Sequence, residues 1–134
     1  MLLLLIDDSE HSDDQIKGLA RKLFSQGATC ANLCGNDQYR LHELADEVRD
    51  EDALFGPITT SSYFLEELDD CLWLTIAGSS PDDEWLDRYP GGEWGDHCAA
   101  VLAVVVGKPE CALRVEQSFT DPDRFIRESL ERDD

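Results

Sequence analysis

The sequence predicts a single α/β domain with a mostly parallel sheet covered by helices. Two runs of apolar residues, at 2–6 and 99–106, are nearly uninterrupted. Strands buried on both faces have this pattern. Segments with helical periodicity alternate with the strand-like segments, which is typical of a parallel sheet. The length of 134 residues fits one domain over residues 1–134.

The first third of the chain predicts a strand, a helix and a second strand. Leu2 to Ile6 form the first strand. Ser12 and Gln15 have the spacing of a capping box, in which each side chain binds a free backbone amide at the start of a helix. Apolar residues at every third and fourth position then form one helical stripe, and Gly27 follows as a C-cap. Residues 29–33 predict the second strand.

The middle of the chain predicts a second helix and a short third strand. The helical stripe contains Leu41, Leu44 and Val48, and the strand covers residues 57–61. Residues 62–78 are compatible with two structures, because periodicity does not distinguish short apolar runs. One is a helix with Ser62 as N-cap, and the other is a short helix followed by a strand over 71–77. We favour the helix.

The last third predicts a long loop over 79–97, a core strand over 99–106 and two helices. Pro109 begins the first of these helices, which continues through Val115, and Asp121 with Pro122 caps the second. This C-terminal helix and a frayed acidic end occupy residues 120–134. The result is a three-layer flavodoxin-like or Rossmann-like domain, with four or five strands and the first strand at the centre.

The charge is strongly negative and narrows the possible partners. The chain has 30 acidic and 11 basic side chains, which gives a net charge of −19. Such a surface repels phosphate backbones and anionic lipids, so we expect neither nucleic acid nor membrane binding. It is compatible with a basic protein partner, with a bound cation, or with solubility alone.

The cysteines and the apolar start indicate a cytoplasmic protein. The five cysteines include no Cys-x-x-Cys pair, so buried, reduced thiols are expected. The first apolar run stops at Asp7, which is too early for a signal peptide or a membrane span.

A pair of carboxylates follows the first strand. Asp7 and Asp8 would lie at the carboxyl edge of the sheet, where ligands bind in open α/β folds. Two carboxylates at this edge could hold Mg²⁺, or one could cap the following turn while the other is solvated. Lys108 should reach the same edge, and an ion pair with this acidic pair is favoured over a catalytic role. The residues expected to line the edge toward a ligand or anion are Ser9, Thr59, Thr60 and Lys108.

The loop over 79–97 carries aromatic and basic residues among many acids. Trp, Tyr and Arg are common at interface hot spots, so Trp85, Arg88, Tyr89 and Trp94 are candidate partner-binding residues. Alternatively, the apolar side chains of this loop pack onto the core. No catalytic set of residues is predicted.

The segment Leu3 to Ser9 and the step Lys108–Pro109 resemble the response-regulator receiver domains. In that family the acidic pair after the first strand holds magnesium, and the lysine contacts a phosphoryl group. The resemblance therefore implies a metal at Asp7 and Asp8. The phosphorylated aspartate of the family has no counterpart here, because residues 56–61 contain no carboxylate.

A longer part of the chain, from Leu3 to Phe119, resembles a small family of uncharacterised bacterial α/β domains. The resemblance is carried by residues 5–9, 27–31, 41–43, 59–60, 72–73 and 104–107. It implies the same layout of strands and helices, including a helix through Leu72, and implies no activity.

Two functional hypotheses follow. The first is an acidic, non-enzymatic binding protein that engages a basic protein, for example as an inhibitor or immunity-type protein. The second is a regulatory domain, similar to a degenerate receiver, that binds a metal or ligand at Asp7 and Asp8. The sequence leaves the oligomeric state open.

Overall fold

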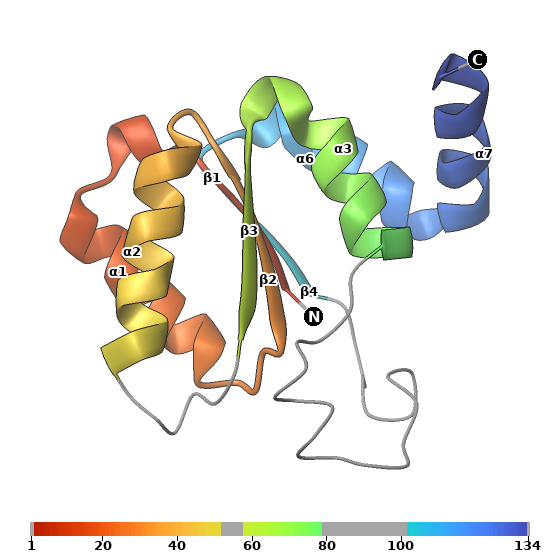
Figure 1. The fold of residues 1–134 in the computed structure, drawn as a ribbon. Coiled ribbons are helices and arrows are strands. Elements are labelled where there is room, and N and C mark those ends of the chain that lie inside the picture. The colour runs from red at the N-terminus through yellow and green to blue at the C-terminus, as the bar shows by residue number, and fades with distance from the viewer. Residues whose placement is uncertain (1, 52–57, 79–101, 134) are drawn as a thin grey trace, which may run out of the picture.

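A computed structural model describes residues 2–51, 58–78 and 102–133 (Figure 1). Within these ranges, four parallel strands form one sheet in the order β3-β2-β1-β4. The predicted α/β class and the central position of the first strand are confirmed. This order is the same as that of the first four strands in a Rossmann sheet, in which β2 lies between β1 and β3. The strands are β1 (Leu2–Ile6), β2 (Cys30–Gly35), β3 (Thr59–Phe64) and β4 (Leu102–Val106).

Helices cover both faces of the sheet and make the domain three-layered (Figure 1). One face carries α1 (Asp13–Phe24) and α2 (Gln38–Glu51), which connect β1 to β2 and β2 to β3. The other face carries α3 (Leu68–Trp73), α6 (Pro109–Thr120) and α7 (Pro122–Asp133). The described helices are all too short or too polar to cross a membrane.

The alternation of side chains along β1 divides the core into two clusters. Leu2, Leu4 and Ile6 pack against the buried sides of α1, which include Phe24, and of α2. Leu3 and Leu5 pack against the helices of the other face. Successive side chains of a strand point to opposite faces, so a continuous apolar run serves both layers.

Two helix predictions are confirmed in detail. The capping box of α1 is present, with the Ser12 hydroxyl accepting from the amide of Gln15 at 3.2 Å and the Gln15 side chain accepting from the amide of Ser12 at 2.9 Å. Pro109 begins α6, which continues beyond Val115 to Thr120.

Residues 58–78 differ in part from the sequence prediction. The helix that we favoured exists, as the short turn Leu65–Glu67, α3 and a π-helical turn over Leu74–Gly78. Ser62 is not its N-cap, because this residue lies inside β3 and pairs with Leu33 of β2. A serine hydroxyl can bond to a helix amide or to another side chain, and here it lies 2.9 Å from His42 Nδ1, so the presence of serine did not settle the boundary. The loop predicted over 79–97 lies outside the described residues.

Charged side chains connect α3, α6 and α7. Asp69 of α3 accepts from Arg114 of α6 at 2.9 Å and from Arg132 of α7 at 2.7 Å. The Arg114 guanidinium also lies over the Phe125 ring, 5.0 Å from its centre. The hydrogen bond from Arg114, followed by that from Arg132, lowers the pKa of Asp69 below its ordinary value, although partial burial opposes this effect.

Replacing Asp69 with asparagine should change the dependence of stability on pH. A carboxylate with a lowered pKa stabilises the folded state fully above its unfolded pKa of 3.8, and this stabilisation disappears as the pH falls through the lower, folded pKa. Partly exposed ion pairs of this kind contribute up to about 1 kcal/mol. Urea unfolding between pH 6 and pH 3 should therefore show D69N less stable than wild type at pH 6, with the difference shrinking toward pH 3. A constant difference over this range would contradict the assignment.

Candidate functional site

The carboxyl end of β1 lies at the point where the strand order of the sheet reverses. From β1 the chain proceeds through β2 to β3 on one side, whereas β4 lies on the other side. The crevice outside such a switch point is the usual ligand position in α/β domains. Asp7 and Asp8 occupy this edge, as predicted, and Lys108 reaches it from the end of β4.

Asp8 is almost fully buried, with 1% of its surface exposed. One carboxylate oxygen accepts from the backbone amide of Asn36 at 2.6 Å, and the other accepts from the amide of Asp37 at 2.8 Å. These amides belong to the turn between β2 and α2. A Cβ atom on Gly35 would lie 3.0 Å from an Asp8 oxygen and would also collide with Leu41. Asp8 therefore fixes the β2–α2 turn to the end of β1.

Asp7 lies beside Asp8, and its carboxylate is surrounded mainly by side chains. Its Oδ1 accepts from the Ser9 hydroxyl at 2.5 Å and from the Asn36 side chain at 3.0 Å, and its Oδ2 lies 3.5 Å from Lys108 Nζ. The hydrogen bond from Ser9 is the main cause that lowers the pKa of Asp7, and the charge of Lys108 lowers it further. The ion pair that the sequence favoured for Lys108 is thus present.

Gly107 allows the chain to approach Asp7 closely before Lys108. Its φ of 77° lies in the left-handed region, and a Cβ atom there would lie 3.0 Å from the Cβ of Asp7. Glycine adopts this conformation without the penalty that other residues carry.

Arg40 of α2 holds the loop that follows Asp8. Its guanidinium donates to the carbonyl of Asp8 at 2.6 Å and to the carbonyl of His11 at 2.9 Å, and it pairs with Asp13 at 2.7 Å. His11 Nδ1 in turn lies 2.6 Å from the carbonyl of Asp7. The loop is therefore held both by α2, through Arg40, and by a contact within the loop, through His11.

These residues do not fit a resident Mg²⁺ ion. Magnesium needs oxygen ligands in near-octahedral geometry and usually retains several waters. Here the oxygens of Asp8 accept from two backbone amides, and an ammonium group lies next to Asp7. Within the described ranges, no group of three or more His, Cys, Asp or Glu side chains is arranged to hold a metal ion.

Thr59 and Thr60 lie near the amino ends of the strands, whereas Asp7 lies at the carboxyl ends. The prediction that they share the edge of Asp7 is therefore wrong. Thr59 begins β3 and is level with Cys30, the first residue of β2. The carboxyl end of β3 is Phe64. The polar sequence of this strand carries no apolar pattern from which its start could be read, and the strand was expected two residues too early.

A second polar network connects α2 to β3. His42 Nδ1 lies 2.9 Å from the Ser62 hydroxyl, and His42 Nε2 lies 3.3 Å from an Asp46 oxygen. The Thr60 hydroxyl donates to Asp46 at 2.7 Å and lies 3.1 Å from His42 Nε2. Arg49 also pairs with Asp46 at 3.2 Å. The network uses both ring nitrogens of His42 and fixes the side chains of β3 to α2.

No family model, curated protein or solved structure matches this chain. The resemblances to receiver domains and to the uncharacterised bacterial family therefore stay predictions.

The candidate site residues from the long loop lie outside the described residues. These residues are Trp85, Arg88, Tyr89 and Trp94, and their role in partner binding stays a prediction. Sequence reasoning also missed Asn36 and Arg40, which complete the cluster around Asp7 and Asp8. Asn36 follows β2 directly, which was an available signal because the carboxyl ends of adjacent parallel strands meet at one edge. Arg40 acts over about thirty residues of chain, as its partners Asp8 and His11 show, and no local pattern indicates this.

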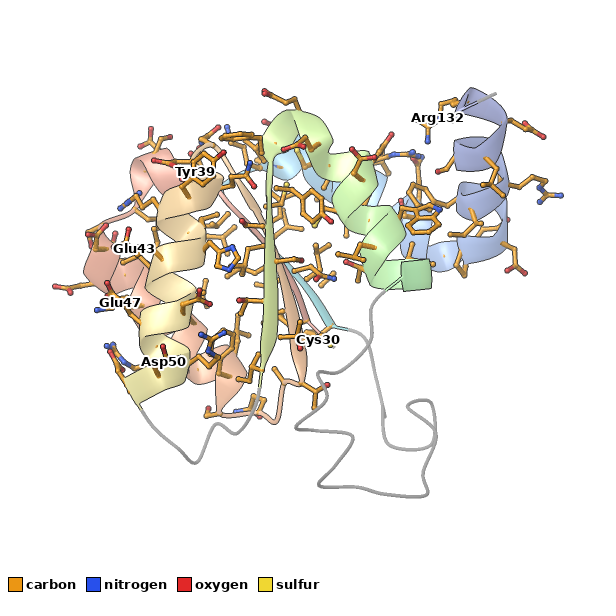
Figure 2. The ribbon with its side chains drawn as sticks, in the orientation of Figure 1. Cys30, Tyr39, Glu43, Glu47, Asp50 and Arg132 are labelled. Atoms are coloured by element: carbon orange, nitrogen blue, oxygen red, sulfur yellow. The ribbon has the colours of Figure 1, made fainter. Side chains whose placement is uncertain are left out.

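The outer side of α2 presents a row of exposed side chains, which we name the α2 acidic face. It consists of Tyr39, Glu43, Glu47 and Asp50, which lie along the helix in Figure 2. Tyr39 is 72% exposed, yet its ring packs edge-on against Phe64 with 5.8 Å between ring centres. An exposed aromatic ring held in this way is available for contact with another molecule.

Proposed function

We propose that this protein is a non-enzymatic binding protein whose α2 acidic face contacts a basic protein, in the manner of an inhibitor or immunity-type protein. The observation that carries the proposal is the α2 acidic face, which combines an exposed, ordered tyrosine with a row of carboxylates.

The chain has more carboxylates than its own basic side chains can pair with. Most basic side chains in the described ranges are paired with acids of the same chain, at 2.7–3.5 Å. Since acids outnumber bases by 30 to 11, many carboxylates are left for an outside partner. Within the α2 acidic face, Glu47 pairs with Lys17 at 2.8 Å and Asp50 pairs with Arg49 at 3.0 Å, whereas Glu43 forms no ion pair with the described residues. Carboxylates at a surface speed association with a basic partner and select against acidic ones. The basic residues in these pairs are Lys17, Arg21, Arg40, Arg49, Lys108, Arg114, Arg124 and Arg132.

Tyr39 gives the acidic face a point of specific contact. Tyrosine is frequent at hot spots because it buries a large ring and loses little conformational freedom. The contact with Phe64 restricts the ring before binding, which reduces the entropy lost on association. By contrast, the polar groups around Asp7 and Asp8 are engaged within the fold.

Capture of partners from an extract of the native host tests the proposal. The immobilised protein should retain a basic protein at low salt and release it as salt rises, because exposed charges are screened. Y39A and E43Q should each weaken retention about tenfold, which is the usual size of a hot-spot or charge contact. E131Q on α7 makes the same charge change on another exposed helix and should retain the partner like wild type.

Two results would refute the proposal. One is that no basic protein is retained at low salt. The other is that Y39A, E43Q and E131Q all retain the same proteins as wild type, because binding would then depend on overall charge and not on the α2 acidic face.

A further inference from the structure

The outer edge of β3 offers backbone groups that β2 does not use. The amide of Thr59 donates to the carbonyl of Thr29 at 3.1 Å, so Thr59 turns its backbone toward β2. In a parallel pair the residues of a strand alternate between the two sides. Thr60 and Ser62 therefore direct their amide and carbonyl groups away from β2. The amide of Phe64, next in this series, accordingly donates to Glu67 at 3.0 Å rather than to β2.

This edge is held in a fixed conformation. The Thr60 hydroxyl donates to Asp46, and the Ser62 hydroxyl lies within hydrogen-bond distance of His42. All six residues of β3 are intermediate in exposure, between the buried strands of the centre and a free surface. A strand whose side chains are tied to α2 can present its outer backbone without further ordering.

Acidic side chains lie on both sides of the edge. Asp46 of α2, the helix that covers one face of β3 in Figure 1, accepts from the Thr60 hydroxyl and also pairs with Arg49 at 3.2 Å. Asp70 of α3 and Glu67 of the turn before it lie on the other face, where their charges add to the effect of burial in raising the pKa of Tyr63. Tyr39 of the α2 acidic face packs on Phe64, so this face adjoins the end of the strand.

We propose that a basic, extended segment of a protein partner binds by adding a strand to the outer edge of β3, at Thr60 and Ser62. This inference rests on the proposed function, and it specifies the mode of binding. Strand addition uses backbone hydrogen bonds for affinity and side-chain surroundings for selection. Around this edge the carboxylates of Asp46, Glu67 and Asp70 outnumber the single guanidinium of Arg49, so lysine and arginine of the incoming segment are selected.

Charge also argues against a second copy of this chain as the occupant. Each copy has a net charge of −19, and pairing β3 with β3 would bring the acids of both copies together. Like charges opposed across a strand pair are destabilising.

The opposite edge of the sheet supplies an internal control. The carbonyl of Val106 accepts from the amide of Asp7 at 2.8 Å, so Val106 turns toward β1. By the same alternation, Ala103 and Val105 direct their backbone groups away from β1. A ligand that binds at β3 should leave the amides of Ala103 and Val105 unchanged.

Amide hydrogen exchange, followed by NMR on the full chain, tests the pairing. The probe is a capped heptapeptide of alternating lysine and valine at low salt, and the control peptide has glutamate in place of lysine. Saturating lysine peptide should slow exchange at Thr60 and Ser62 by about tenfold or more, as expected when an exposed amide enters a ladder. The glutamate peptide should have no effect, and Ala103 and Val105 should not change with either peptide.

A pair of variants at one position separates backbone pairing from side-chain contact. Ser62→Ala removes the hydroxyl and keeps the amide, whereas Ser62→Pro also removes the outward amide. Because this amide does not serve β2, proline is tolerated at such an edge position. S62A should bind the lysine peptide within about twofold of wild type, and S62P at least about tenfold more weakly, which corresponds to the loss of one backbone hydrogen bond. Circular dichroism and the melting temperature of both variants establish that they are folded.

Several outcomes overturn the proposal. Exchange that is already slow at Thr60 and Ser62 in the free protein would mean that the edge is covered within the chain. Slowing that grows with protein concentration, without peptide, would identify a second copy as the occupant. Failure of the lysine peptide to bind would also overturn it, as would equal binding by S62A and S62P. If S62P folds poorly, the exchange result at Thr60 and Ser62 decides.

The two proposals can fail separately. If the capture experiment succeeds with Y39A and E43Q impaired, but exchange at Thr60 and Ser62 is unaffected by the lysine peptide, the α2 acidic face binds without strand addition. If capture fails while the peptide slows exchange, the edge binds basic segments and the protein-inhibitor role is wrong.

Discussion

Asp8→Ala should destabilise the protein by about 2–4 kcal/mol, because a buried carboxylate that accepts two amides is lost. Both oxygens of Asp8 accept from backbone amides of the turn after β2, and only 1% of the residue is exposed. Without the carboxylate, the amides of Asn36 and Asp37 lose their partner at the end of β1. Urea unfolding followed by circular dichroism at pH 7 measures the loss.

Two further variants define the reason for this effect. Asp8→Asn keeps the size of the side chain but turns an NH₂ group toward one of the two amides, so a smaller loss is expected. Glu10→Gln removes a charge from an exposed residue of the same loop and should change stability by less than about 0.5 kcal/mol. In addition, millimolar Mg²⁺ should leave the melting temperature of wild type unchanged. A loss below 1 kcal/mol in D8A, or a clear rise in melting temperature with Mg²⁺, would show that Asp8 is not primarily a structural acceptor.

Gly35→Ala should destabilise the protein by about 1–3 kcal/mol, the usual cost of forcing an extra methyl group into a packed site. The added Cβ would lie 3.0 Å from Asp8 Oδ1 and closer still to Leu41. Leu41 belongs to the buried cluster beneath α2, and Asp8 is held by two amides, so neither can move away easily.

Gly18→Ala is the matched control. Gly18 lies inside α1, and nothing lies within 4 Å of the position of its Cβ. Alanine has a higher helix propensity than glycine, so this variant should be more stable than wild type by about 0.5–1 kcal/mol. Thermal and urea unfolding of both variants should therefore give opposite signs. Stabilisation by G35A would mean that the turn after β2 can relax, and that the contact between Asp8 and this turn is not tightly packed.

Much of the fold could be predicted because strong local patterns coincide with single elements. The run Leu2 to Ile6 has no polar residue, which is compatible with a central strand, and the capping box at Ser12 fixes the start of α1. These signals depend only on residues within one turn or one strand.

The third strand shows why other parts could not be predicted. Most of its residues, from Thr59 to Phe64, carry hydroxyl groups. Thr60 donates a hydrogen bond to Asp46 of α2, and the next residue, Ser61, donates to Asn32 of β2. The partners that stabilise this polar strand lie 14 to 29 residues away in the sequence. Its position, and with it the edge to which Thr59 and Thr60 belong, depends on those distant contacts and not on periodicity.

The candidate site could be predicted only in part, because it too depends on contacts between residues that are distant in the sequence. Asp7, Asp8 and Lys108 were placed at one edge by the rule that parallel strands end together. Their actual roles depend on Asn36, Asp37 and Arg40, which supply the groups that occupy the carboxylates and the loop. A pair of acids that is suitable for a metal in sequence thus becomes an internal support once its neighbours are known.

The short outer edge of β3 has a consequence for self-association. An unpaired strand edge can template the growth of ordered aggregates, and proteins often limit this with short edges and nearby charges. Among the residues that the structure describes, this edge offers the backbone groups of Thr60 and Ser62, and Glu67 occupies the next amide. Carboxylates that would attract a lysine-rich segment also repel another copy of an equally acidic chain, so the same side chains would serve both selectivity and resistance to fibril formation.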